Sequence, residues 1–332
     1  MGEPLRFSGI IPANVLPFNS DCSIDETDYR GHLRWLAGVR GVTGMTVNGH
    51  AAEVSSLSRE ERRRALAIAV DEVGPRLPVI AGIYTDSTWE GVELARDAKA
   101  EGAGGLLVFP PAVFMWGVQL RPEMAVRHIR AIADAVDLPL VVFQYPIASG
   151  LGYDPDTLVR LTEIPRVAAV KEWSNDIVAF EQNLRAIRAT GWPVAVLSSF
   201  TMSLFGSFAL GADGAISGMG SVAADLQAEL FAHVQHGDLE AARRVNDRLE
   251  PLVRVFYAPP FLDMHNRMKE ALVLLGRIRR AVVRPPLLPV TDAERERIRA
   301  ALAQAGLSRS RPSTGPAVES RDAEARRPAP SR

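Results

Sequence analysis

Short runs of apolar residues alternate with longer segments that carry apolar residues at helical spacing, from about residue 8 to residue 217. Each short run is almost continuously apolar, as are the strands of a parallel sheet that is buried on both faces. The pattern therefore predicts eight strands. They span residues 8–15, 42–48, 78–82, 105–109, 138–144, 167–171, 194–198 and 214–217.

Helix start signals stand between these runs. Ser58 and Glu61 have the spacing of a capping box, and Asp154 before Pro155 offers an N-cap with proline at the first helical position. Eight β-α units in about 230 residues predict an α/β fold, the (β/α)8 or TIM barrel. A doubly wound open sheet is the alternative. It loses support because the chain has neither a G-x-G-x-x-G motif after the first strand nor a P-loop.

After the eighth strand the pattern becomes purely helical, over residues 223–237, 238–257, 262–275 and 291–305. From residue 308 the chain is rich in Ser, Pro, Arg and Glu and has almost no large apolar residue, a composition typical of disorder. We therefore expect a barrel over residues 1–222, a C-terminal helical extension over 223–307 and a disordered tail over 308–332.

The composition is that of an ordinary soluble globular protein, with 332 residues, 47% hydrophobic and 23% charged. The formal net charge is −1 and no basic stripe stands out, so nucleic-acid binding has little support. Cys22 is the single cysteine, which rules out an intrachain disulfide. No apolar stretch reaches the length of a membrane span, and no signal peptide is recognisable. A cytoplasmic protein that does not bind membranes is expected.

Lys171 closes the apolar run at residues 167–170. An ammonium is costly to bury, so this lysine either extends to water or is held partly neutral, and a neutral lysine is a nucleophile towards carbonyl groups. Alternation along the strand places Lys171 on one face with Val167 and Ala169, whose small side chains leave room for a substrate. Reactive groups of such barrels gather at the C-terminal ends of strands, which favours the nucleophile.

The loop after the second strand, residues 48–57, leads into the helix that Ser58 begins. Glycine and alanine in a turn before a helix leave backbone N–H groups free for a carboxylate ligand. A tight turn without any ligand is the alternative interpretation.

The other histidines are expected to have ordinary roles. His32 and His128 lie in predicted outer helices and are interpreted as surface residues. His233 and His236 are three residues apart, with His265 farther along the chain. No metal site is expected there, because these late helices should follow the barrel rather than line its mouth. The sequence implies no other cofactor.

Several short motifs follow one another at characteristic spacing. They are residues 12–18, 49–53, 57–62, 78–82, 170–172, 211–217, 268–272, 275–276 and 284–287. Together they resemble the dihydrodipicolinate synthase / N-acetylneuraminate lyase family of class I aldolases over roughly residues 7–307. The resemblance implies the barrel fold and a Schiff base between Lys171 and the ketone of pyruvate or another 2-oxo acid. It also implies that the carboxylate lies on backbone N–H groups around Ala51 and Ala52, with Ile216 lining the pocket.

The chain departs from the family pattern at several positions. The usual Gly-Thr-Thr-Gly-Glu reads Gly-His-Ala-Ala-Glu at residues 49–53, so both hydroxyl groups are missing. Phe143 stands where the family has a tyrosine, and it lines the substrate pocket without being able to transfer a proton. Residues 110–112 lack the tyrosines common there in the synthases, and Ala148 aligns with the carboxylate-binding arginine. These losses argue against dihydrodipicolinate synthesis.

Two residues are candidates to compensate. His50 takes the place of the first threonine and titrates near neutrality, so it suits a general acid/base role. A loop histidine that only shapes the pocket is the alternative. Tyr145 lies on the same face as Phe143 and offers a phenol nearer the mouth, although packing under the next loop is the favoured role for it. Aromatic residues around the mouth suggest an apolar end to the substrate.

The sequence thus predicts a class I lyase or aldolase that acts on a 2-oxo acid through Lys171. A dehydratase or hydratase-aldolase using the same imine is the alternative within enzymes. A barrel that binds a 2-oxo acid and turns nothing over is the alternative outside them. The small-molecule substrate is the expected partner, and the resemblance implies a homo-oligomer, a tetramer or dimer.

Overall fold

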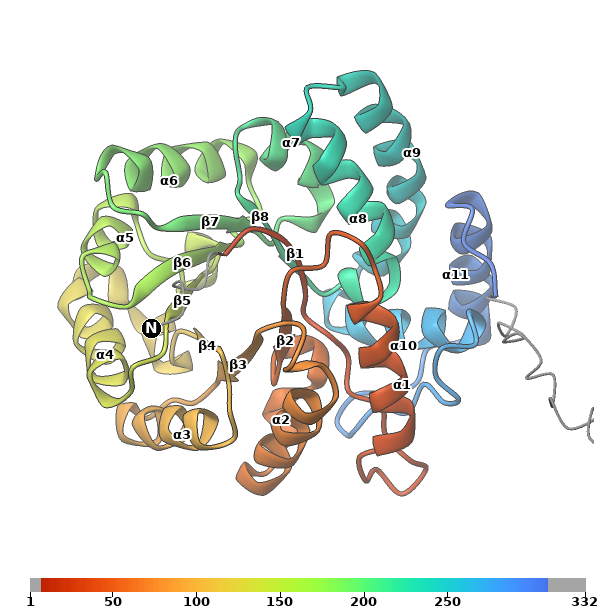
Figure 1. The fold of residues 1–332 in the computed structure, drawn as a ribbon, viewed down its shortest axis with the longest axis horizontal. Helices are drawn as coiled ribbons and strands as arrows, with labels where there is room; N and C mark the ends of the chain where they lie inside the picture. Colours follow the sequence, from red (N-terminus) through yellow and green to blue (C-terminus); the bar gives the residue numbers. More distant parts are fainter. Residues whose placement is uncertain (1–6, 310–332) are drawn as a thin grey trace, which may run out of the picture.

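Eight parallel strands form a nearly closed barrel in the computed structural model, which describes residues 7–309 (Figure 1). Each strand from β2 to β8 pairs with its neighbour in sequence, and β8 pairs with β1. Parallel bridges at Ile10–Val42 and Ala13–Thr46 join β1 to the segment around β2. The strands are β1 (Gly9–Pro12), β2 (Met45–Val47), β3 (Val79–Ile83), β4 (Gly105–Val108), β5 (Leu140–Gln144), β6 (Val167–Glu172), β7 (Ala195–Ser198) and β8 (Gly214–Ser217). All eight predicted strands and the (β/α)8 fold are confirmed.

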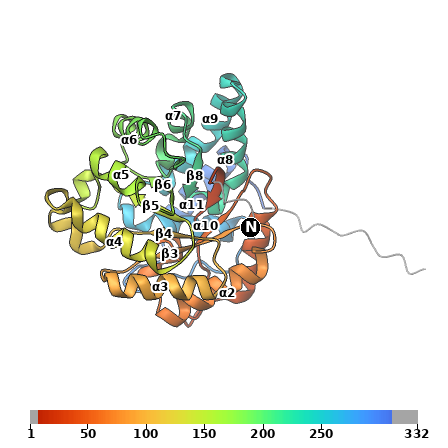
Figure 2. The ribbon, with the colours of Figure 1, turned by 60° about the vertical axis from the view of Figure 1, so that its left-hand side comes forward.

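Helices surround the strands on the outside of the barrel (Figures 1 and 2). They are α1 (Glu26–Ala37), α2 (Arg59–Val73), α3 (Thr88–Ala100), α4 (Pro122–Ala135), α5 (Pro155–Thr162), α6 (Ile177–Ala189), α7 (Leu204–Ala209) and α8 (Gly220–Gln235). The predicted start signals act as expected. Ser58 accepts from the Glu61 N–H while the Glu61 side chain accepts from the Ser58 N–H, and Asp154 accepts from the Thr157 N–H.

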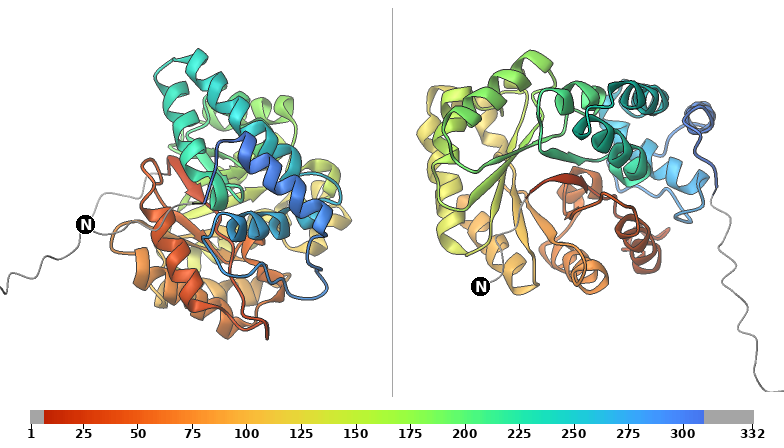
Figure 3. Two further views of the ribbon diagram at one scale, coloured as in Figure 1. Left: turned by 90° about the vertical axis from the view of Figure 1, so that its right-hand side faces the viewer. Right: turned by 45° about the horizontal axis from the view of Figure 1, so that its top comes forward.

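The C-terminal part of the described chain adds α9 (Leu239–Phe256), α10 (Met264–Leu274) and α11 (Asp292–Gln304), which gather beside α8 (Figure 3). The predicted late helices are therefore confirmed. The predicted domain boundary after residue 222 falls inside α8, next to the non-helical backbone of Ala223, and it stays a prediction. Residues 310–332 of the predicted tail lie outside the described residues. Among residues 7–309, no helix is long and apolar enough to span a membrane.

The start of the loop after β2 is held by a close approach of two backbones. A Cβ atom on Gly82 would lie 2.0 Å from the carbonyl oxygen of Asn48, so no side chain fits there. Asn48 itself has a left-handed backbone with φ of 55°, and its side-chain amide donates to the Arg62 carbonyl at 2.9 Å. These contacts fix the direction in which the chain leaves β2 and enters the barrel mouth.

The interpretation of His32 and His128 as surface residues is wrong. His32 is fully buried in α1, where its ring stacks on Trp35, and His128 is 3% exposed in α4. The Nδ1 atom of His128 is hydrogen-bonded to the Thr88 hydroxyl of the neighbouring helix α3 at 2.9 Å. Both rings lie on helix faces that pack against the rest of the fold, and a lone histidine in a helical pattern does not show which face it occupies.

Candidate active site

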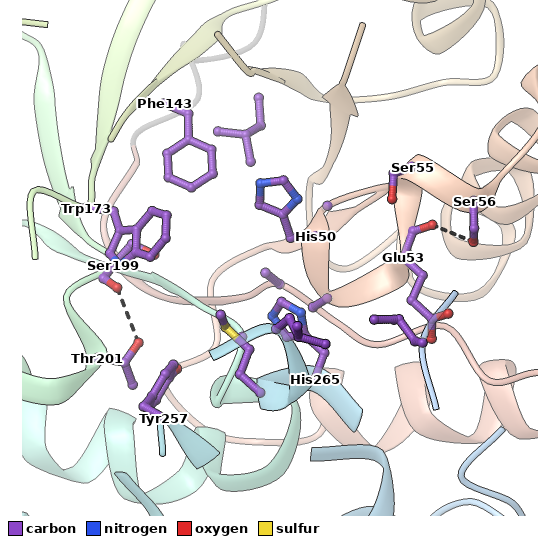
Figure 4. Close-up of a pocket in the computed structure, with 18 of the residues that line it drawn as sticks. His50, Glu53, Ser55, Ser56, Phe143, Trp173, Ser199, Thr201, Tyr257 and His265 are labelled. Atoms are coloured by element: carbon purple, nitrogen blue, oxygen red, sulfur yellow. Dashed lines mark hydrogen bonds between the residues drawn. The ribbon is translucent and has the colours of Figure 1, made fainter. Parts of the chain in front are cut away.

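A cavity of about 330 Å³ opens at the C-terminal ends of the strands, where (β/α)8 barrels carry their reactive groups (Figure 4). Its lining comes from β4, β5 and β6, from the loops after β2, β6, β7 and β8, and from the segments around α10. The lining residues that carry chemistry are His50, Glu53, Lys171, Ser199, Thr201, Tyr257, His265 and Arg284.

Lys171 points into this cavity from β6, opposite Phe143 of the neighbouring strand β5. Its ammonium nitrogen lies 3.6 Å from the centre of the Phe143 ring, and the residue is 7% exposed. Within the described residues, no carboxylate lies within 4 Å of it. Burial lowers the pKa of Lys171 to about 7. The ring attracts a cation by about 0.5–2 kcal/mol and opposes that shift in part. The amine is thus roughly half neutral at pH 7.

His50 begins the 3-10 helix η1 (His50–Ala52) in the loop after β2, and its Nε2 atom is hydrogen-bonded to the Tyr145 hydroxyl that follows β5. The His50 residue is exposed, yet the protein atoms around its ring displace water, and this desolvation together with the charge of Lys171 lowers the pKa of His50, so the ring is neutral at pH 7. Burial raises the pKa of Tyr145 well above its usual value. The two groups form a hydrogen-bonded pair in which both are neutral at pH 7, and the shifts make the imidazole a weaker base and the phenol a weaker acid than usual.

The predicted carboxylate site at η1 has fewer free backbone N–H groups than expected. The Ala52 N–H already donates to the Gly49 carbonyl at 3.0 Å, and Ala52 does not reach the cavity. Ala51 lines the cavity, and among residues 7–309 its N–H and that of His50 donate to no backbone acceptor. These two amides are therefore the donors that remain for a substrate carboxylate.

Ile216 is fully buried in β8 and does not line the cavity. In register, Lys171 pairs with Leu197 and Leu197 pairs with Gly214, which places Gly214 and Ile216 on the inward side of the barrel. Ile216 thus packs in the barrel interior, and its contact with a substrate stays a prediction.

His265 is the functional residue that sequence reasoning missed. The late helices were expected to lie away from the mouth, but α10 reaches it and His265 lines the cavity, where Figure 4 shows it across from His50. A Cβ atom on Gly218 would lie 3.1 Å from its Nε2 atom. Burial, together with the charges of Lys171 and Lys269, lowers the pKa of His265, so this ring too is neutral at pH 7. No group of three or more potential metal ligands occurs among the described residues.

A buried ion network forms another wall. Lys269 of α10 is fully buried and donates to the Glu53 carboxylate and, at 2.9 Å, to the Val282 carbonyl. The other oxygen of Glu53 accepts the N–H of Arg284 at 2.8 Å. The Arg284 side chain is itself bonded to Glu61 and to backbone carbonyls. These charged side chains are therefore paired within the network.

The barrel carries at its strand ends a cavity lined by an amine and two imidazoles, and the Tyr145 phenol, which does not line the cavity, is bonded to one of those imidazoles. This arrangement is that of a (β/α)8-barrel enzyme. The chain belongs to the dihydrodipicolinate synthetase family, whose family model matches residues 6–305, and this is a family of lyases.

Named relatives agree with that assignment. A 4-hydroxy-tetrahydrodipicolinate synthase of Nitrobacter hamburgensis is 33% identical over 92% of this chain and 99% of its own length. The crystal structure of a chloride-inhibited dihydrodipicolinate synthase from Acinetobacter baumannii, complexed with pyruvate, has a TM-score of 0.80 and 30% identity, covering 90% of this chain and 99% of that one. A structure described as a monomeric dihydrodipicolinate synthase variant has a TM-score of 0.82 and 28% identity, covering 91% and 97%. The homo-oligomer expected here stays a prediction.

Proposed function

We propose that this protein is a class I lyase or aldolase that forms an imine between Lys171 and pyruvate or another 2-oxo acid. The observation that carries the proposal is a buried lysine that lines the cavity beside an aromatic ring and has no carboxylate partner within 4 Å among the described residues, and burial lowers its pKa to about 7. A neutral amine is the nucleophile such chemistry requires.

The reaction follows from ordinary imine chemistry. The Lys171 nitrogen adds to the ketone carbon, and the carbinolamine loses water to give a protonated imine. The imine withdraws electrons from the bond to the neighbouring carbon, C3 of the acid. Loss of a proton from C3 then gives an enamine, which attacks an aldehyde, and water finally releases the product and the free lysine. Run backwards, the same steps cleave a 4-hydroxy-2-oxo acid.

The remaining groups have roles in this scheme that their positions support. The backbone N–H groups of His50 and Ala51 are available to hold the substrate carboxylate, and the Acinetobacter relative is described as a complex with pyruvate. The bonded pair of His50 and Tyr145 is suited to move protons to and from C3 and the reacting oxygens. His265 offers a second neutral imidazole across the cavity.

We further propose that the reaction is not dihydrodipicolinate synthesis, although named relatives carry that activity in their names. Phe143 cannot transfer a proton, and the loop residue Ala148 neither bears a charge nor lines the cavity. A dehydratase or hydratase-aldolase is the second candidate, since the imine equally promotes loss of a hydroxyl group as water once His50 or His265 supplies the proton. A silent 2-oxo-acid-binding barrel is what remains if no turnover is found.

Borohydride trapping tests the imine directly. Incubation with pyruvate and sodium borohydride should give a reduced pyruvate adduct on the tryptic peptide of Lys171, detected by mass spectrometry. Lys171→Ala should give none. Lys99→Ala is the matched control, because Lys99 is half-exposed and paired with Asp137, and it should keep the adduct. The proposal would be refuted if the wild type gave no adduct, or if Lys171→Ala gave as much adduct as the wild type.

Exchange of the pyruvate methyl protons for deuterium, followed by NMR, measures enamine formation without a second substrate. His50→Ala should slow this exchange by about 10²–10⁴-fold while the trapped adduct persists. Tyr145→Phe should slow it as well, because the phenol is the hydrogen-bond partner of His50. His236→Ala, an exposed histidine at the end of α8, is the control. A near-normal rate in His50→Ala would end its role as the proton-transfer group.

A further inference from the structure

The half of the cavity beyond Lys171 is walled by aromatic and aliphatic side chains. Trp173, two residues after the lysine, lies 5.3 Å from the Tyr145 ring and stacks on Phe261, with ring centres 6.1 Å apart and planes within 11°. Tyr257 continues the row, 5.8 Å from Phe261. Leu262 and Met264, which follow Phe261 in the chain, also line the cavity, as do Pro285, Pro286 and Leu287.

The other charged residues that line the cavity are already paired, so they are not free to pair with a second charged group on a substrate. Apart from Lys171 and the histidines, the charged lining residues are Glu53 and Arg284. Glu53 is paired with Lys269 and accepts from the Arg284 backbone, while the Arg284 guanidinium is bonded to Glu61 and to the carbonyls of Cys22 and Ser56. A carboxylate in this half would lose its water without gaining a cation, which costs several kcal/mol.

Two of the lining hydroxyl groups are committed, whereas those of Ser55 and Ser199 have no hydrogen-bond partner among residues 7–309. Thr201 donates toward the Ser199 carbonyl at 3.4 Å and lies 3.2 Å from the Ser217 hydroxyl, and Ser56 donates to the Glu53 carbonyl at 2.8 Å. A polyhydroxylated substrate has these two serine hydroxyls to pair with, and its other hydroxyls would lie unpaired against the apolar wall, which disfavours its binding.

We propose that the second reactant is an uncharged aromatic aldehyde, seated against Trp173 and the apolar wall with its carbonyl carbon toward the imine of Lys171. This inference rests on the proposed function. The new bond joins C3 of the enamine to the aldehyde carbon, the aldehyde oxygen takes a proton and becomes a hydroxyl, and water releases a 4-aryl-4-hydroxy-2-oxo acid. No oxidant or reductant is required.

Condensation with pyruvate tests the proposal on the full chain. Benzaldehyde, 4-oxobutanoate and glyceraldehyde represent the aromatic, the charged and the polyhydroxylated class. Benzaldehyde should have a kcat/KM at least about 100-fold above that of the other two, since an unpaired charge or several unpaired hydroxyls each cost a few kcal/mol. Product is followed by chromatography and mass spectrometry. A charged or polyhydroxylated aldehyde that matches or exceeds benzaldehyde would overturn the proposal.

A matched pair of variants sharpens the test. Leu262→Arg places a cation in the wall, and it should lower the ratio of benzaldehyde to 4-oxobutanoate by about 10-fold or more, whereas Leu262→Met, which keeps the wall apolar, should leave that ratio within about threefold. Trp173→Ala should lower kcat/KM for benzaldehyde by about 10-fold or more through lost ring contact. An unchanged ratio in Leu262→Arg contradicts the assigned wall.

The pyruvate adduct keeps the two proposals apart. If the wild type gives no trapped adduct, the imine itself fails and the aldehyde inference falls with it. If the adduct forms but no aldehyde condenses, or a charged aldehyde is preferred, the imine stands and the aromatic acceptor alone is refuted. If the adduct forms and benzaldehyde is preferred, both are supported.

Discussion

Two lysines are buried beside the same cavity, and their surroundings differ. Lys269 of α10 is fully buried, 4.2 Å from the centre of the Phe18 ring, and is bonded to Glu53 and to a backbone carbonyl. Lys171 of β6 is nearly as buried and also lies on an aromatic ring, yet it has no carboxylate partner within 4 Å among residues 7–309. The chain has one further lysine, the half-exposed Lys99.

The difference separates a lysine held in an ion pair from the lysine that the proposed function makes the nucleophile. Burial lowers the pKa of Lys269 to about 8, but Glu53 opposes the shift, so the group stays mostly charged at pH 7 and belongs to an ion pair. With no such partner, burial lowers the pKa of Lys171 to about 7. A facing carboxylate thus favours the charged form of a buried lysine, whereas burial without a carboxylate favours the neutral form.

The largest expected contrast between the two lysines is in stability. Lys269→Met leaves the Glu53 carboxylate buried without its cation, which should lower the free energy of unfolding by about 3–5 kcal/mol. Lys171→Met removes a buried charge that has no partner, so stability should stay equal or rise. Denaturant unfolding at pH 7 measures both.

A double variant checks the reason for that contrast. Adding Glu53→Gln to Lys269→Met removes the stranded carboxylate and should recover part of the loss. If Lys269→Met is as stable as wild type, or Lys171→Met is the more damaged of the two, the distinction between paired and unpaired lysine is wrong.

The barrel and Lys171 could be predicted because their signals are local. Apolar runs mark the strands, Ser58 and Asp154 mark helix starts by hydrogen bonds to residues three positions away, and an amine closing an apolar strand is conspicuous by its cost. Each signal lies within a few residues of the feature that it predicts.

What the sequence could not indicate depends on contacts between distant segments. The hydrogen bond between His50 and Tyr145 joins residues 95 positions apart, and His265 enters the cavity only because α10 folds back over the mouth. The pairing of Lys269 with Glu53 spans 216 positions. Periodicity gives the faces of a helix but not the neighbour that each face meets, so the roles of these side chains had to come from the fold.

The next largest expected effect is on the pH dependence of imine formation, in which Lys171 should differ from a solvated lysine. Below its pKa of about 7 Lys171 becomes an ammonium, so the rate of adduct formation should fall about tenfold for each pH unit and level off above pH 8. A solvated lysine would keep gaining rate up to about pH 10. Rapid trapping at a fixed pyruvate concentration, from pH 5.5 to 9.5, gives the profile. A rate still rising tenfold per unit at pH 9 would contradict a depressed pKa.

The lowered pKa of Lys171 also makes the stability of the fold depend on pH. The folded pKa of Lys171 lies below the unfolded value near 10.5, so the unfolded chain binds the extra proton between about pH 7 and 10.5. The cost of burying this ammonium is therefore complete below pH 7 and disappears as the pH rises toward 10.5. Lys171→Met should accordingly gain more stability over the wild type at pH 6 than at pH 9.

The smallest expected effect concerns the ring beneath the reactive amine. The Phe143 face stabilises the ammonium form of Lys171 by about 0.5–2 kcal/mol, so Phe143→Leu should lower the pH at which imine formation is half-maximal by about 0.4–1.5 units. Phe143→Tyr keeps the aromatic face and is the matched control, and its half-point should stay near that of the wild type. Because the ring favours the charge while burial opposes it, a half-point that moves upward in Phe143→Leu would mean that the ring acts mainly by excluding water from the amine.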